Sequence, residues 1–210
     1  MPSATPTTIK PTSQPSAMPS SCRLLPNPID ICLLIDGSES IDDPQFALSL
    51  EFTRDIVNKV STMSSDSSYS VVVFSSDAQL VGARNENAAA TIVKLTNTHH
   101  PKQGTQTVEG FNACQATFEN VDRPHIILLL TDGDPNGAGS NAEALAEATA
   151  AATAAKNAGT IIVSIGVGTL ISTTNLMTWA TNPGFVFTAT DFTGLASITD
   201  NIINQLKCGP

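Results

Sequence analysis

The chain has 210 residues, enough for one domain of ordinary size with a buried core and some residues left for a tail. Its formal net charge is −9 at pH 7, and an acidic surface repels phosphate groups, so nucleic acids and anionic membranes are disfavoured as partners. No apolar run approaches the roughly 20 residues needed to span a bilayer, so we expect no membrane insertion of this segment.

Residues 1–21 are dominated by Pro, Ser and Thr. Such a segment buries too little apolar surface to offset its ordering entropy, which predicts a disordered linker. Its composition is typical of O-glycosylated stalks of cell-surface proteins. The first residues do not form a signal peptide, so the protein is either intracellular or a piece of a longer secreted one. We favour the second alternative and expect an extracellular or cell-surface location.

From residue 29 onward the pattern alternates between strands and helices. Residues 29–35 form a near-continuous apolar run, as in a strand buried on both faces. Asp43 and Pro44 then predict the N-cap and first position of a helix. Two short strands, 69–74 and 79–81, predict a hairpin at one edge of the sheet.

The second half of the domain repeats this alternation. We predict strands at 125–130, 160–167 and 185–188, and helices that include 141–156, 173–181 and 192–207 in addition to earlier ones. The fold class is therefore α/β: a doubly wound, mostly parallel six-stranded sheet, with helices on both faces and one antiparallel edge strand, over residues 22–208.

Four cysteines are distributed along the chain without a C-x-x-C pair. Cys22 and Cys208 flank the predicted domain, whose ends often lie close together in this architecture, so we predict a disulfide between them. Cys32 lies in a predicted central strand and Cys114 in a predicted helix. These two could pair with each other or serve as small core residues.

Three polar loops should meet beyond the carboxyl ends of the strands, where open α/β sheets bind their ligands. Asp36, Ser38 and Ser40 follow the first strand, Thr105 precedes a helix, and Asp132 follows the fourth strand. Two carboxylates and three hydroxyls are hard ligands, suited to Mg²⁺, with Mn²⁺ or Ca²⁺ as alternatives. Alternate residues of an extended loop face one side, so the first three can converge on one ion.

These loops resemble a known family. Residues 36–40 read Asp-Gly-Ser-Glu-Ser and resemble the D-x-S-x-S signature of von Willebrand factor A and integrin inserted domains. Residues 104–107 resemble the family's threonine loop, and residues 131–133 its third loop. The three motifs occur in the family's order and form its metal-ion-dependent adhesion site. The chain departs from the family pattern at residues 108–110 and 134–135, without loss of a candidate ligand.

The resemblance implies a role for each residue. Ser38 and Ser40 would ligate the ion directly and Asp36 mainly through water, while Thr105 and Asp132 would exchange direct and water-mediated roles. The free metal position would take a Glu or Asp of a protein ligand in the extracellular matrix, cell wall or cell surface. The resemblance thus implies an adhesion module. The sequence shows no Ser-His-Asp set, nucleophile elbow or poised Cys-His pair, so we expect no catalysis.

Two other functions are weighed against adhesion. A Mg²⁺-dependent phosphohydrolase needs a second carboxylate two residues after the first and a nearby lysine. Position 38 is serine, however, and neither of the two loops that carry an aspartate, residues 36–40 and 131–133, contains lysine. An intracellular assembly factor with the same domain is disfavoured by the cysteines and the Pro/Ser/Thr tail.

His99 and His100 precede a proline in a loop, and we expect them to lie on the surface.

Overall fold

The computed structural model describes residues 28–119, 122–136 and 139–208, except for the side chain of residue 208. The predicted linker, residues 1–21, and the predicted Cys22–Cys208 bridge lie outside this described part. Within it, no helix combines the length and apolar character needed to cross a membrane.

Six strands form one mixed sheet, which confirms the predicted fold class. The strands are β1 (Asp30–Asp36), β2 (Ser68–Phe74), β3 (Ala78–Leu80), β4 (His125–Gly133), β5 (Ile161–Leu170) and β6 (Val186–Ala189). Their order is β3-β2-β1-β4-β5-β6, and only the β2–β3 pair is antiparallel. The order reverses at β1, so the crevice between the loops after β1 and β4 lies at the topological switch point.

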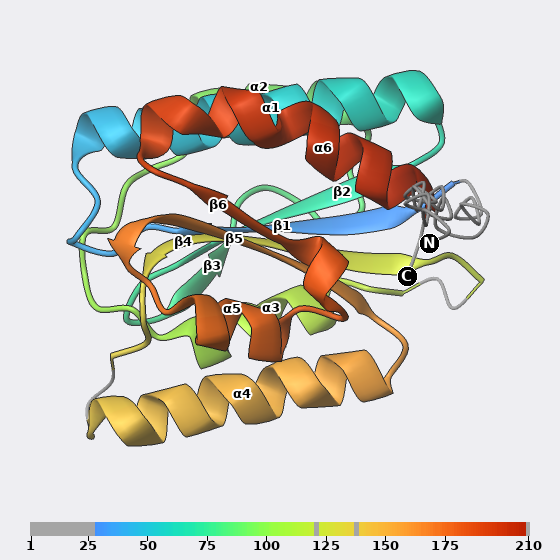
Figure 1. The fold of residues 1–210 in the computed structure, drawn as a ribbon. Helices are drawn as coiled ribbons and strands as arrows, with labels where there is room; N and C mark the ends of the chain where they lie inside the picture. Colours follow the sequence, from blue (N-terminus) through green and yellow to red (C-terminus); the bar gives the residue numbers. More distant parts are fainter. Residues whose placement is uncertain (1–27, 120–121, 137–138, 209–210) are drawn as a thin grey trace, which may run out of the picture.

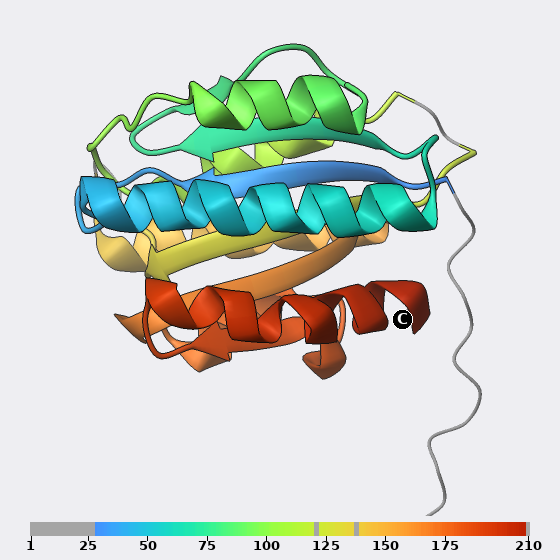
Figure 2. The same ribbon diagram turned by 90° about the horizontal axis from the view of Figure 1, so that it is seen from above.

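Helices cover both faces of the sheet (Figure 1). One layer contains α1 (Asp43–Met63), α2 (Ala88–Thr96) and α6 (Leu195–Cys208), which lie side by side when the molecule is seen from above (Figure 2). The other layer contains α3 (Thr107–Gln115), α4 (Asn141–Asn157) and α5 (Thr173–Trp179), and two short 3-10 turns flank β6.

The alternation of side chains along β1 divides the core into two clusters. Ile31, Leu33 and Ile35 face the layer of α1 and α6, whereas Cys32 and Leu34 face the layer of α3, α4 and α5. All are essentially inaccessible to solvent. A central strand buried on both faces requires apolar residues at every position, which explains the unbroken run in the sequence.

Helix α1 begins one position earlier than the sequence suggested. Asp42, rather than Asp43, is the N-cap: its side chain accepts a hydrogen bond from the Gln45 backbone N–H, and the Gln45 side chain accepts one from the Asp42 N–H. This reciprocal capping box satisfies two backbone N–H donors. Proline is tolerated at more than one position of the first turn, so the proline alone does not determine where the helix begins.

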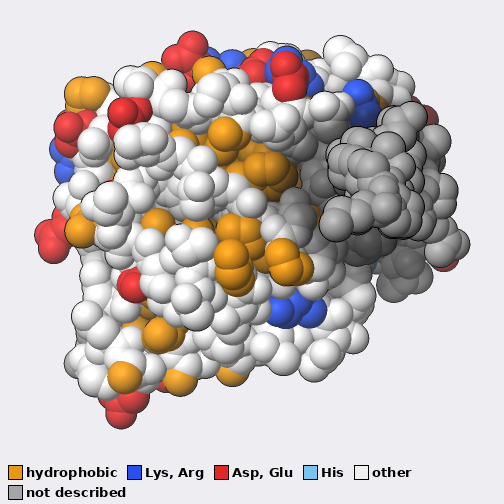
Figure 3. Space-filling view, in the orientation of Figure 1, with side chains coloured by type: hydrophobic (Ala, Val, Ile, Leu, Met, Phe, Trp, Pro, Cys, Tyr) orange, Lys and Arg blue, Asp and Glu red, His pale blue; other side chains and the backbone are white. Residues whose placement is uncertain are grey.

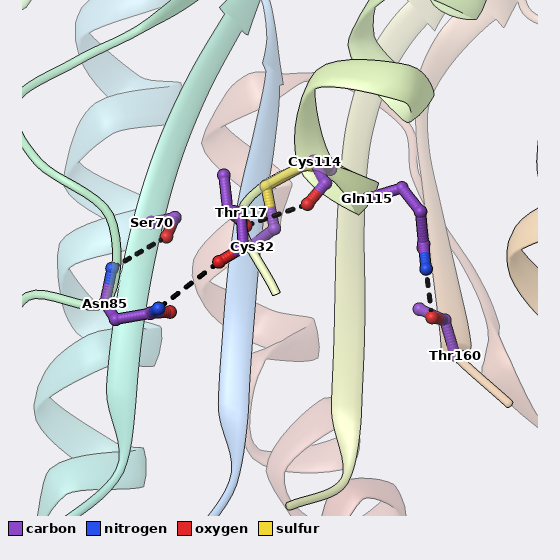
Figure 4. The surroundings of a disulfide bond; sticks show 7 residues. All are labelled: Cys32, Ser70, Asn85, Cys114, Gln115, Thr117 and Thr160. Carbon is purple, nitrogen blue, oxygen red and sulfur yellow. Dashed lines mark hydrogen bonds between the residues drawn. A yellow bond between two sulfur atoms is a disulfide. The ribbon is translucent and has the colours of Figure 1, made fainter. Parts of the chain in front are cut away.

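Helix α3 lies very close to the sheet. A β-carbon at Gly110 would come within 2.8 Å of Leu34 and 3.2 Å of Phe74, so only glycine allows this approach. A disulfide between Cys32 of β1 and Cys114 of α3, with both side chains fully buried, fastens the helix to the strand (Figure 4). The pairing that the sequence left open is therefore present.

Candidate metal centre

The first loop of the site turns sharply out of β1. The Gly37 N–H donates to the carbonyl of Phe74 at 2.8 Å, and a β-carbon at Gly37 would lie 2.7 Å from both Val73 and Pro101, so this position requires glycine. The turn is closed by the Ser38 N–H, which donates to the Asp36 carboxylate at 2.9 Å. Asp36 and Ser38 are consequently buried, and Ser40 is exposed at the rim.

The segment before α3 lies against this loop. The Glu39 N–H donates to the carbonyl of Gln103 at 2.8 Å, and the Lys102 N–H donates to the carbonyl of Gly37 at 2.9 Å. Thr105 follows Gln103 by two residues and is itself buried. Backbone pairing between the two loops therefore fixes the threonine beside the first loop.

Asp132 completes the set from the end of β4. The Ser40 hydroxyl donates to its carboxylate at 2.8 Å, and the Ser38 and Ser40 hydroxyl oxygens are 3.0 Å apart. Because the hydrogen of Ser40 is used on Asp132, Ser38 is the donor in that second contact. The lone pairs of Ser38 remain available, which is the arrangement an incoming cation needs.

The structure thus brings the sequence-predicted residues to one edge of the sheet, with one difference in how they are held. Ser38, Ser40 and Asp132 form a hydrogen-bonded chain, and Asp36 accepts from the Thr131 hydroxyl at 2.6 Å. Thr105 is held instead by Asn136, whose side-chain N–H donates to its hydroxyl oxygen at 3.3 Å.

The two carboxylates are electrostatically uncompensated. Burial raises the pKa of Asp36 to about 6 despite hydrogen bonds from Thr131 and Ser38, and the charge of Asp132 raises it further. Burial also raises the pKa of Asp132, against the hydrogen bond from Ser40. Of the ion pairs among the described residues, none includes either carboxylate. Two buried acids without a cationic partner are what a bound dication would stabilise.

The donor set fits a hard divalent cation better than a soft one. Nowhere in the described ranges do three or more His, Cys, Asp or Glu side chains cluster as a metal site. The candidate centre depends instead on hydroxyl oxygens and two carboxylates, a set in which nitrogen and sulfur ligands have no part. The residues present therefore fit Mg²⁺ or a related ion.

Comparison with known proteins shows the family of the chain. Residues 30–201 match the sequence model of the von Willebrand factor type A domain. The chain belongs to the von Willebrand factor type A domain family. A search among curated proteins finds no match.

Solved structures share the fold of this A domain. Proximal thread matrix protein 1 from the mussel byssus superposes with a TM-score of 0.76 and 22% identity, covering 89% of this chain and 49% of that one. A structure of the same mussel protein with a zinc occupied MIDAS motif superposes with a TM-score of 0.73 and 24% identity, covering 84% of this chain and 45% of that one. The pilus adhesin SpaC from Lactobacillus rhamnosus GG superposes with a TM-score of 0.70 and 14% identity, covering 85% of this chain and 30% of that one. The chain spans about half the length of the mussel protein.

The expectation that both histidines lie on the surface is wrong for His100. His99 is exposed, but the ring of His100 is buried and stacked on Phe46, with ring centroids 4.3 Å apart. One ring nitrogen lies 2.9 Å from the Asp43 carboxylate and the other 3.4 Å from the Ser38 carbonyl. The imidazole thus fills the space behind the first metal loop of the A domain. The proline that follows predicts a loop but carries no information about burial.

A hollow of about 260 Å³ opens beside Asp132 and Ser40. The far wall comes from the end of β5, which extends three residues beyond the predicted strand and exposes Gly168, Thr169 and Leu170. Asp132 and Asp191 contribute two carboxylates to its lining, and Figure 3 shows both acidic and basic side chains at this end of the molecule (left). A partner therefore meets a concave surface with two acidic residues beside the candidate centre.

Proposed function

We propose that this A domain is an extracellular adhesion module that binds one divalent cation and, through it, an acidic side chain of a protein ligand. The observation that carries the proposal is that two buried carboxylates, neither in an ion pair among the described residues, lie with the hydroxyls of Ser38 and Ser40 at the switch point of the sheet, with Thr105 on the adjoining loop. Asp36, Ser38, Ser40, Thr105 and Asp132 would hold the ion, with Mg²⁺ as the first candidate and Mn²⁺ or Ca²⁺ as alternatives.

The charges explain why an acidic ligand fits. Two carboxylates neutralise a dication, and the hydroxyls complete its coordination without adding charge. A bound dication supplies an electrophilic position that a ligand carboxylate can fill. Without the ion the same carboxylate would meet Asp132 in a rim that is acidic already, and would be repelled.

Several observations support a binding module over an enzyme or an intracellular assembly factor. Position 38 is a serine within hydrogen-bond distance of another serine, not a second carboxylate. The Cys32–Cys114 disulfide fits an oxidising compartment. The zinc occupied MIDAS motif of the mussel protein and the adhesin function named for SpaC lend support by analogy.

The proposal is tested first with the cation alone. Calorimetric titration of the chelator-treated protein should show one Mg²⁺ or Mn²⁺ site, and Asp132→Ala should weaken binding at least tenfold. The matched control is Asp122→Ala, in the turn that precedes β4 and therefore at the end of the strand opposite Asp132, which should bind as wild type. Absence of binding to wild type, or equal binding by Asp132→Ala, overturns the metal site.

Ligand binding is tested next. Extracellular proteins captured in Mg²⁺ and released by chelator are identified, and the Glu or Asp that each presents is changed to its amide. The amide should reduce affinity about as much as removal of the ion. If chelator leaves affinity unchanged, the adhesive surface lies elsewhere on the domain.

A further inference from the structure

Asn136, in the loop after β4, contacts Thr105 through three hydrogen bonds. Its side-chain oxygen accepts from the Thr105 N–H at 2.8 Å, its side-chain N–H donates to the Thr105 hydroxyl at 3.3 Å, and its own backbone N–H donates to the Thr105 carbonyl at 3.0 Å. No other residue pair joins the threonine loop to the third loop so densely among the described contacts. Both ends of the Asn136 amide are therefore committed to one neighbour.

The orientation of this amide follows from its partners. The Thr105 N–H can only donate, so the amide oxygen must face it, and the amide nitrogen is then directed at the Thr105 hydroxyl. That hydroxyl accepts from Asn136 and retains one further lone pair. The contact therefore selects the rotamer of Thr105 and determines which lone pair faces the centre.

The loop that carries Asn136 is anchored a second time. The Asp134 carboxylate accepts from the Ser172 N–H at 3.0 Å and from the Asn175 side chain at 2.8 Å, which ties the loop to the start of α5. Pro135, between the two anchors, restricts the backbone further. Asn136 and Asp132 thus belong to one short, doubly fixed segment.

We propose that Asn136 is a positioning residue that locks Thr105 to the Asp132 loop, so that these two candidate ligands are presented as one rigid unit. The inference rests on the proposed metal site. It adds a residue outside the five candidate ligands, and it predicts that the two loops move together: displacement of the third loop carries Thr105 with it. Asp134→Ala provides the matched control, because it loosens the same loop without touching Thr105.

The test is a double-mutant cycle read as Mg²⁺ affinity. Residues that orient metal ligands typically contribute about 10- to 100-fold in affinity, so Asn136→Ala should weaken binding by at least about tenfold. In a Thr105→Ala background the same change should cost clearly less, because the hydroxyl that Asn136 orients is gone and only the bond to the backbone N–H of residue 105 remains. Asp134→Ala should cost clearly less than Asn136→Ala. An equal loss from Asn136→Ala in both backgrounds overturns the proposal.

A second readout needs no metal. In the chelator-treated protein, Asn136→Ala should speed hydrogen exchange of the Thr105 amide at least tenfold, whereas Asn136→Asp should preserve protection because its carboxylate still accepts that bond. If Asn136→Ala fails to fold, Asn136→Ser replaces it, since serine is too short to reach both atoms of Thr105. If exchange of the Thr105 amide is unchanged in Asn136→Ala, the proposed positioning role of Asn136 is wrong. If wild type fails to bind Mg²⁺, the proposed function is wrong, but the exchange result still stands.

Discussion

Replacing Asp36 by asparagine should stabilise the metal-free domain while it abolishes cation binding. The carboxylate is fully buried, and its pKa in the folded protein is about 6, compared with 3.8 in the unfolded chain. A raised pKa means that the folded state binds a proton more tightly than the unfolded state. Stability is therefore lost as pH rises from about 4 to about 6, and the full cost is present above that range.

The destabilisation caused by the ionised Asp36 follows from the shift of its pKa. Each pKa unit corresponds to 1.36 kcal/mol, so a rise from 3.8 to about 6 costs the metal-free protein about 3 kcal/mol at pH 7.5. Asparagine avoids this cost and retains the hydrogen bonds: its oxygen can accept from the Ser38 N–H, and its N–H can donate to Thr131, whose hydroxyl is 3.1 Å from the Gly133 carbonyl. For a domain of this size, about 3 kcal/mol raises Tm by about 6 to 12 °C.

The assay is thermal unfolding in chelator at pH 7.5 and at pH 4, with Glu39→Gln as the control that removes an exposed charge from the same loop. Asp36→Asn should unfold at higher temperature than wild type at pH 7.5, the difference should nearly vanish at pH 4, and Glu39→Gln should resemble wild type. Saturating Mg²⁺ should raise Tm of wild type and of Glu39→Gln, but not of Asp36→Asn. A less stable asparagine variant at pH 7.5, or a gain that persists at pH 4, would refute the reasoning.

Three further outcomes are expected. Changing Cys32 and Cys114 together to alanine removes a bridge that spans 82 residues of sequence and should lower the free energy of unfolding by about 4.5 kcal/mol in the chain-entropy limit. Denaturant titration measures this change, and a loss below about 1 kcal/mol would contradict it. His100→Phe keeps the stacked ring but removes both nitrogen contacts, so calorimetry should show weaker Mg²⁺ binding with little loss of fold; unchanged affinity would show that the ring only fills space. Mass spectrometry of the non-reduced, secreted protein should find Cys22 joined to Cys208, and two free thiols there would exclude the bridge.

The sequence by itself determined the architecture and predicted the types of candidate ligand. The alternation of apolar strands with helices predicted the doubly wound sheet, because strands buried on both faces require unbroken apolar runs such as that of β1. Asp36 and Asp132 could be predicted to lie together because residues that directly follow parallel strands all reach the same edge of the sheet. That inference needs only the order of the elements, not their exact packing.

The tertiary structure alone decided which distant residues meet. Cys32 and Cys114 pair because α3 approaches β1 closely over Gly110, a distance that no local pattern encodes. The burial of His100 and the contact between Asn136 and Thr105 likewise depend on how separate loops stack at the edge of the sheet. Local propensities are set by near neighbours along the chain, whereas these contacts join segments 31 or more residues apart and follow from the packing of the whole domain.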